Sequence, residues 1–111
     1  MQDWAKELPM AVTVTDKNGI IIYMNDKSIE TFANYGGDKL IGTELNAWHN
    51  PHSVEIINAM ISENKANSYT ISKNGVKKLI HQTPYFEGGE YAGLVEFSIV
   101  LPEEMPHFDR G

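Results

Sequence analysis

The dipeptide Asn74-Gly75, set between two runs of alternating polar and apolar residues, constrains this chain more than any other feature of its sequence. Asn-Gly favours the positive φ angles of a two-residue turn that joins antiparallel strands. Residues 69–73 and 76–83 are therefore predicted to pair as a hairpin, with Lys73 opposite Val76. The last third of the chain is accordingly β structure.

A second hairpin is predicted near the N-terminus, over residues 11–24. Two runs rich in β-branched residues flank a turn at residues 16–19, where a glycine tolerates positive φ. A further strand, alternating from Gly93 to Leu101, is stopped by Pro102. The chain thus begins and ends in strands.

The middle of the chain is predicted to be helical, because its apolar residues recur at helical spacing. Either Asn25 or Asp26 caps a first helix, which ends at Gly36-Gly37. A longer helix starts at Pro51, where a missing N–H costs nothing, with Asn50 as its cap.

This segregated order of strands, helices and strands predicts an α+β fold, with an antiparallel sheet covered on one face by helices. The 111 residues suffice for one domain. We divide the chain into an N-terminal flanking helix at 1–10, a domain at 11–102 and a C-terminal tail at 103–111. The fold requires the N-terminal and C-terminal β segments to join in one curved sheet.

Composition argues against several classes of function. A net charge of −6 lacks the basic footprint that direct binding of DNA or RNA needs. Without cysteine there are no disulfides, thiolate nucleophiles or cysteinyl adducts. No apolar run approaches the length of a membrane span, so a cytoplasmic protein is expected. The sequence has no serine elbow, P-loop or dinucleotide fingerprint, and we predict that it is not an enzyme.

Three stretches resemble the PAS family. Residues 8–25 are similar to its first hairpin, which ends in an asparagine before the first helix. Residues 37–45 contain Leu40-Ile41-Gly42 and resemble the turn that follows that helix, and residues 89–95 resemble the entry to the last strand. Residues 48–53 are also similar to a histidine-proline-serine stretch of some small bacterial and archaeal PAS modules.

The resemblance implies a five-stranded antiparallel sheet that cups a group of helices. It also implies a sensory module of signal transduction, often dimeric, that binds a small molecule between the sheet and the long helix. The ligand and the signalling output protein, whether separate or fused, are not identified by it. The alternative is a ligand-free module for dimerisation or protein–protein interaction, since function belongs to the site and not to the fold.

The predicted pocket is apolar and aromatic, with a few polar tips, as small-molecule sites usually are. The helices contribute one set of residues and the sheet another. Together the predicted ligand-binding side chains are Phe32, Trp48, His49, His52, Ile57, Ile61, Tyr69, Ile80 and Phe97.

His49 and His52 flank the start of the long helix, whose N-terminal dipole favours neutral imidazole. Neutral imidazole is the form that binds iron. In PAS domains that hold heme, an axial histidine comes from this helix or near it, so the resemblance implies His49 or His52 as an axial heme ligand. A mononuclear metal held by His52, Glu55 and His49 is a weaker alternative.

The outer face of the sheet is predicted to carry apolar residues among polar ones, which usually indicates a partner surface. PAS domains commonly dimerise through that face and a flanking N-terminal helix. A homodimer is therefore expected, with interface residues Trp4, Leu8, Leu79 and Leu94.

Overall fold

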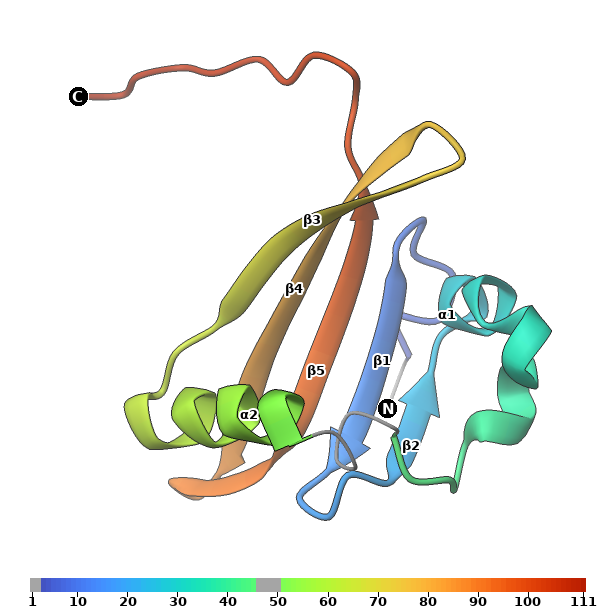
Figure 1. The fold of residues 1–111 in the computed structure, drawn as a ribbon, viewed down its shortest axis with the longest axis vertical. Coiled ribbons are helices and arrows are strands. Elements are labelled where there is room, and N and C mark those ends of the chain that lie inside the picture. The colour runs from blue at the N-terminus through green and yellow to red at the C-terminus, as the bar shows by residue number, and fades with distance from the viewer. Residues whose placement is uncertain (1–2, 46–50) are drawn as a thin grey trace.

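A computed structural model of the chain describes residues 3–45 and 51–111 (Figure 1). Within those ranges, no helix is both long and apolar enough to cross a membrane. The elements are, in chain order, β1 (Ala11–Asp16), β2 (Ile21–Met24), α1 (Asp26–Thr31), the 3₁₀ helices η1 (Ala33–Tyr35) and η2 (Gly37–Leu40), α2 (Pro51–Glu63), β3 (Asn67–Lys73), β4 (Val76–Glu87) and β5 (Glu90–Val100).

The strands form one antiparallel, five-stranded sheet in the order β2-β1-β5-β4-β3, which confirms the predicted α+β class. β1 lies beside β5, so the N-terminal and C-terminal β segments join in a single sheet, as required. Lys73 pairs with Val76 across Asn74-Gly75, whose φ angles of 53° and 78° are both positive. These are the angles that the predicted turn demands.

Both α-helices pack on the same face of the sheet, which we call the inner face. Thr13 of β1 contacts Ser28 of α1. Leu94 of β5 packs with Ile57 of α2 in a buried cluster, and Leu94 is paired with Thr15, two residues along the strand from Thr13. In Figure 1, α2 lies over one end of β4 and β5, whereas α1 lies beside β1 and β2. The middle of the inner face lies between these two helices.

The N-terminal segment corrects one prediction, because residues 3–10 form hydrogen-bonded turns and not a helix. So few residues before a proline cannot offset the cost of nucleating a helix. The turn is held instead by Asp3, whose carboxylate accepts from the backbone N–H of Ala5 at 3.2 Å and from the Tyr23 hydroxyl at 2.8 Å. Burial, together with this hydrogen bond, raises the pKa of Tyr23 to about 12.

Asn25 is only 1% exposed and ties three segments together. Its Oδ1 accepts from the backbone N–H of Val12 at 2.9 Å and of Ser28 at 3.0 Å. Its Nδ2 donates to the carbonyl oxygens of Ala5 at 2.9 Å and Met10 at 2.8 Å. Of the two predicted caps, Asn25 is thus the one that begins α1, and the same side chain fixes the N-terminal segment against β1.

We predict that Asn25→Ala lowers the free energy of unfolding by about 3 kcal/mol, because it leaves two N–H groups and two carbonyl oxygens without their partner. Urea denaturation followed by circular dichroism measures the change. Asn34→Ala is the matched control, since Asn34 is exposed and its loss should change stability by less than about 0.5 kcal/mol. Equal, small effects of both substitutions would contradict the structural role of Asn25.

Candidate functional site

Four polar side chains form a row across the inner face of the sheet, here called the transverse polar row: Asn67, Gln82, Glu96 and Thr13. Each is paired in register with the next, on β3, β4, β5 and β1 respectively. Asn67 Nδ2 donates to Gln82 Oε1 at 3.1 Å, and Gln82 Nε2 donates to Glu96 Oε1 at 3.3 Å. Thr13 Oγ1 and Ser28 Oγ share a hydrogen bond of 2.6 Å, which extends the row to α1.

From Asn67 to Gln82 and from Gln82 to Glu96, each side-chain amide donates a hydrogen bond to the next residue of the row. An ionised carboxylate can only accept, so Gln82 must turn its NH₂ group toward Glu96 and its amide oxygen toward Asn67. In the part of the chain that the structure describes, no other side chain donates a hydrogen bond to Glu96. Glu96 therefore keeps acceptor capacity that the row does not use.

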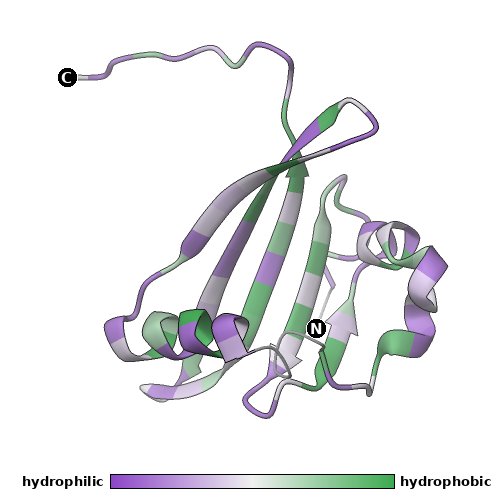
Figure 2. Ribbon diagram, in the orientation of Figure 1, coloured by the Kyte–Doolittle hydropathy of each residue, from purple (hydrophilic) through white to green (hydrophobic). Residues whose placement is uncertain are grey.

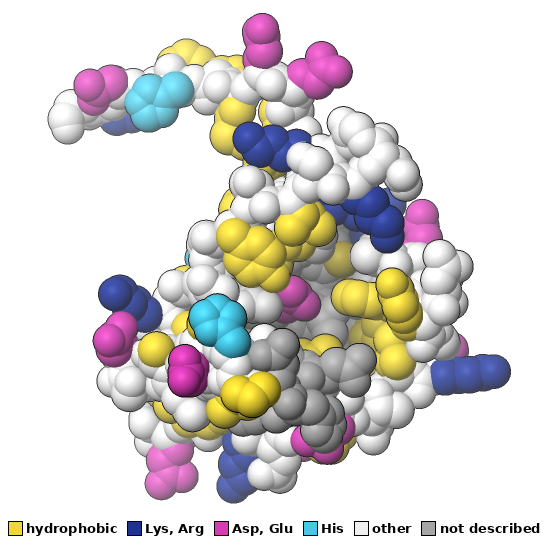
Figure 3. Space-filling model, viewed as in Figure 1, with side chains coloured by type: hydrophobic (Ala, Val, Ile, Leu, Met, Phe, Trp, Pro, Cys, Tyr) yellow, Lys and Arg dark blue, Asp and Glu magenta, His cyan; other side chains and the backbone are white. Residues whose placement is uncertain are grey.

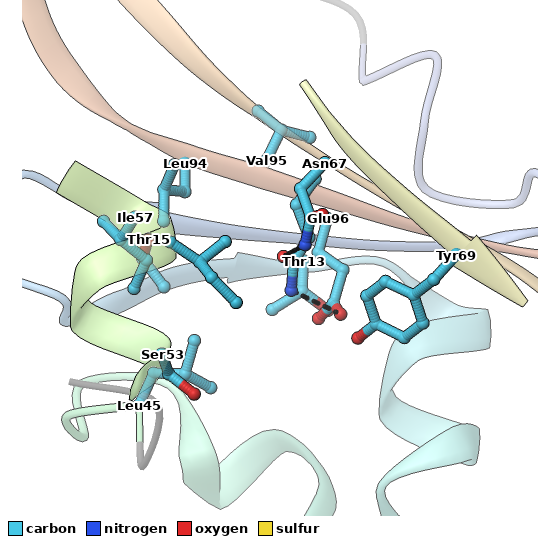
Figure 4. A pocket seen from close by; sticks show the side chains of 12 residues that line it. Thr13, Thr15, Leu45, Ser53, Ile57, Asn67, Tyr69, Leu94, Val95 and Glu96 are labelled. Atoms are coloured by element: carbon cyan, nitrogen blue, oxygen red, sulfur yellow. Dashed lines mark hydrogen bonds between the residues drawn. The ribbon is translucent and has the colours of Figure 1, made fainter. Parts of the chain in front are cut away.

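A cavity of about 300 Å³ lies over this row, between the sheet and α2. Figure 4 shows its residues, and Figure 3 shows the hollow from the same side as Figure 1, with an acidic group between hydrophobic side chains. Its volume is at the lower end of the range for small-molecule sites. The residues that line it are Thr13, Thr15, Leu45, Ser53, Ile56, Ile57, Asn67, Tyr69, Gln82, Leu94, Val95 and Glu96.

Burial raises the pKa of the Glu96 carboxyl, and the hydrogen bond from Gln82 opposes this shift only in part. The folded protein therefore holds this proton more tightly than the unfolded chain does. The stability from this group is complete below the ordinary glutamate value of 4.5 and is lost as the pH rises through the raised pKa. Burial, and then the nearby charge of Glu96, also raises the pKa of the Tyr69 hydroxyl.

Thr15 adds a further polar group to the cavity lining. Thr15 is 2% exposed, and its Oγ1 has no hydrogen-bond partner among residues 3–45 and 51–111. A buried hydroxyl without a partner costs free energy, so such groups call for an explanation. Here the hydroxyl belongs to a residue that lines the same cavity as Glu96.

Four of the predicted pocket residues line cavities at this face. Ile57 and Tyr69 line the cavity over the row. Phe32 and Ile80 line an adjoining cavity of about 280 Å³, which also has Glu96 in its lining. A further cavity of about 530 Å³ shares Glu96 as well, so the carboxyl lies where these spaces meet.

Other predicted residues lie elsewhere. Trp48 and His49 fall outside the described residues, and His52 is exposed as the second residue of α2. Ile61 packs, partly buried, against the core cluster of α2 and β5. Among residues 3–45 and 51–111, no group of three His, Cys, Asp or Glu side chains is placed to hold a metal ion. The predicted metal site of His49, His52 and Glu55 includes one residue outside these ranges and stays a prediction.

The predicted facing of β5 is wrong by one residue. Phe97, predicted in the pocket, lies beside His81 on the outer face, with 6.5 Å between the ring centroids. Leu94, predicted at an outer interface, is 8% exposed and packs against α2. We predicted that the more apolar of the two alternating sets of β5, which contains Phe97, faces the helices. In the structure, the set that faces the helices is Leu94, Glu96 and Ser98.

The remaining predicted interface residues are at least partly accessible. Leu79 lies on the outer face, half-buried and paired with Ile99. Trp4 is 74% exposed, and Leu8 is half-buried in the N-terminal segment. These positions leave the proposed dimer surface untested.

The transverse polar row was missed because its members look like ordinary solvent-facing residues in the sequence. One signal could have revealed it: a glutamate stands at the centre of β5, an 11-residue strand that is otherwise rich in apolar residues. Figure 2 shows that β5, in the middle of the sheet, has hydrophilic positions between hydrophobic ones. In a central strand, such a side chain needs either solvent or a partner.

No protein-family model matches the sequence, and the search of curated proteins returns no match. Solved structures do match. The Aer2 receptor of Vibrio cholerae, described as a dual PAS-heme oxygen sensor, is 14% identical with a TM-score of 0.63, over 84% of this chain and 95% of that one. The PAS domain of Bordetella pertussis BvgS is 21% identical with a TM-score of 0.57, over 88% and 81%.

A third similar structure is that of VqmA, a Vibrio cholerae protein, bound to DPO. It is 18% identical with a TM-score of 0.65, over 88% of this chain and 54% of that one. The fold of this chain, with the strand order β2-β1-β5-β4-β3 and helices on one face, is thus similar to that of solved PAS domains. The fold of this chain is the PAS fold, as its sequence resemblance implied.

Proposed function

We propose that this chain is a sensory module of signal transduction, which binds a small molecule in the cavity between α2 and the sheet. The sheet transmits the binding of this molecule to a second copy of the chain or to a signalling partner. No catalytic step is assigned to the chain.

The observation that carries this proposal is the transverse polar row. A cavity that is only a packing defect of the hydrophobic core would be lined by apolar groups, because burying polar groups costs free energy unless they are paired. This cavity instead presents the carboxyl of Glu96 and the hydroxyl of Thr15 beside apolar residues of α2. Apolar walls with a few convergent polar groups are typical of ligand sites.

The similar structures support the proposal from a different direction. Aer2 is described as a PAS-heme oxygen sensor, and VqmA is described as bound to DPO. Chains of this fold therefore include at least two that hold quite different small molecules. The ligand of this chain has to be inferred from its own lining.

Heme is the alternative ligand, with His49 or His52 as the axial residue. His49 lies outside the described residues, and the His52 side chain is exposed at the start of α2. The described lining, with a carboxyl and two amides, suits a polar ligand better than an extended apolar ring system. An absorption spectrum separates the two.

A ligand-free interaction module is the second candidate, and the outer face of the sheet favours it. Because the inner face takes the polar residues, the outer face carries an apolar set that the chain leaves half-buried. This set is Val14, Leu79, Val95, Phe97 and Ile99. It suits a homodimer or a separate signalling protein.

We predict that the protein, purified gently from its own host, carries a small-molecule adduct in native mass spectrometry that is released on denaturation. Ser53→Trp, which places an indole in the cavity, should abolish the adduct, whereas Ser62→Trp on the exposed part of α2 should keep it. An absorption spectrum recorded on the same sample reveals heme by a Soret band. No adduct, or one that survives Ser53→Trp, argues against this site.

Thr15→Val should raise the free energy of unfolding by about 1 kcal/mol, because it replaces an unpartnered buried hydroxyl by a methyl group of the same shape. Thr13→Val makes the same change on the same strand and face, but it removes the partner of Ser28 and should destabilise by about 1–2 kcal/mol. Thermal unfolding measures both. A destabilised Thr15→Val protein would mean that the hydroxyl serves the fold and not a ligand.

Leu79→Glu should convert a homodimer into a monomer, as measured by light scattering, because it places a charge in the apolar outer face. Met105→Glu makes the same change at an exposed residue of the tail and should leave the dimer intact. A monomeric wild-type protein, or a dimeric Leu79→Glu protein, would exclude this face as the dimer interface.

A further inference from the structure

Among the residues that the structure describes, the lining of the cavity over the transverse polar row has one charged side chain, the carboxyl of Glu96, and no lysine or arginine. One adjoining cavity, which shares Glu96, does include Lys73 and Lys78. In the described part of the chain, neither lysine forms an ion pair with Glu96, so the protein supplies no cation to this carboxylate.

The neutral polar groups around Glu96 also favour a ligand that donates hydrogen bonds. Gln82 uses its NH₂ group on Glu96 and its oxygen on Asn67, which leaves the carboxylate as the free acceptor at the end of this chain of bonds. The Thr15 hydroxyl, which has no partner within the described residues, is a second group able to accept. A ligand that donated to both would satisfy a partly buried carboxylate and a buried hydroxyl at once.

Tyr69 strengthens the preference for positive charge. Figure 4 shows its ring at the edge of the cavity with the hydroxyl directed toward Glu96, and the charge of Glu96 acts on the pKa of that hydroxyl. A cation held by the carboxylate would lie near this hydroxyl, whose oxygen can accept a further hydrogen bond. The combination of a carboxylate and a hydroxyl acceptor is suited to an organic cation that donates hydrogen bonds.

The opposite side of the cavity is apolar. Leu45, Ile57 and Leu94 line it, and Ile56 of α2 completes the wall. A ligand that fills this space therefore has an apolar body and a polar end. The volume of about 300 Å³ limits it to the size of a small metabolite.

Resting on the proposed ligand-binding function, we infer that the ligand is a small organic cation, with an ammonium, amidinium or protonated heteroaromatic nitrogen that donates to Glu96. Its apolar body packs beside Ile57 and Leu94. The ligand supplies the ion-pair partner that no described residue provides to this carboxylate, which converts a partly buried charge into a charge-assisted hydrogen bond.

Three probes of similar shape and different charge test this inference: benzylamine, benzyl alcohol and benzoate. Each is titrated into the full ¹⁵N-labelled chain, and amide shifts of residues around Thr15 and Glu96 report binding. Benzylamine should bind at this site, more tightly than benzyl alcohol, and benzoate should not bind. Glu96→Gln should weaken benzylamine at least about tenfold and leave benzyl alcohol little changed.

Glu90→Gln is the matched control, since it removes the same charge from an exposed position of the same strand and should leave benzylamine binding unchanged. Both variants must give the dispersed spectrum of the wild type. If Glu96→Gln does not fold, titration of the wild type across pH replaces it. Benzylamine, which stays cationic between about pH 5 and pH 8, should bind more weakly as Glu96 becomes protonated.

In that titration Glu96 is followed together with the other ionisable groups that line its cavities. These are Tyr35, Glu44, Tyr69, Lys73 and Lys78. Among the described residues of these linings, Glu44 is the other carboxylic acid, and Glu44→Gln should leave the pH dependence of benzylamine binding in place.

The outcomes distinguish this inference from the proposed function. If benzyl alcohol or benzoate binds around Glu96 as tightly as benzylamine, the site binds ligands but does not select cations, and only the inference is overturned. If benzylamine shifts residues elsewhere on this acidic chain, or binds Glu96→Gln equally well, the inference is likewise overturned. If no probe perturbs the cavity, both the inference and the proposed function are contradicted.

Discussion

The pairing of β1 with β5 is the interaction on which the rest of the structure depends, because it joins two β segments that lie at opposite ends of the chain. It runs from Ala11 opposite Ser98 to Asp16 opposite Gly93. At Gly93 the backbones come so close that a Cβ atom would clash with the carbonyl oxygen of Thr15. A glycine at this position therefore allows the central strands to meet along their whole length.

The register of that pairing decides which side chains meet the helices. Because side chains alternate along a strand, placing Thr13 opposite Glu96 puts both on the inner face and turns Val12 and Phe97 outward. A shift of one residue would bury the valines and the phenylalanine and expose the glutamate. The chain thus keeps the less apolar set inside, although the other set would give a larger hydrophobic contribution to stability. We attribute this choice to the binding site and not to the fold.

The sequence predicted those features that are set by local chemistry. Asn74-Gly75 determines its own turn angles, and a cap of α1 at Asn25 or Asp26 follows from a local side-chain oxygen, of which the structure uses that of Asn25. The facing of β5 could not be predicted in this way, since both alternating sets contain apolar residues and the general rule favours burying the larger ones. The prediction of an N-terminal helix was wrong for a related reason, because contacts of this segment through Asp3 and Ala5 replace helical hydrogen bonds.

The same alternation connects the two surfaces to which we assign function. Val95, Glu96 and Phe97 are consecutive on β5, and the side chain of Glu96 is on the inner face whereas those of its two neighbours are on the outer face. A ligand that draws the Glu96 carboxylate toward itself acts on a strand whose next side chains form the apolar outer surface. The hydrogen bonds from Gln82 and Asn67 link Glu96 to β4 and the edge strand β3. Under the proposed function, a central strand with a polar inner face and an apolar outer face would transmit ligand binding to a partner without the movement of a separate domain.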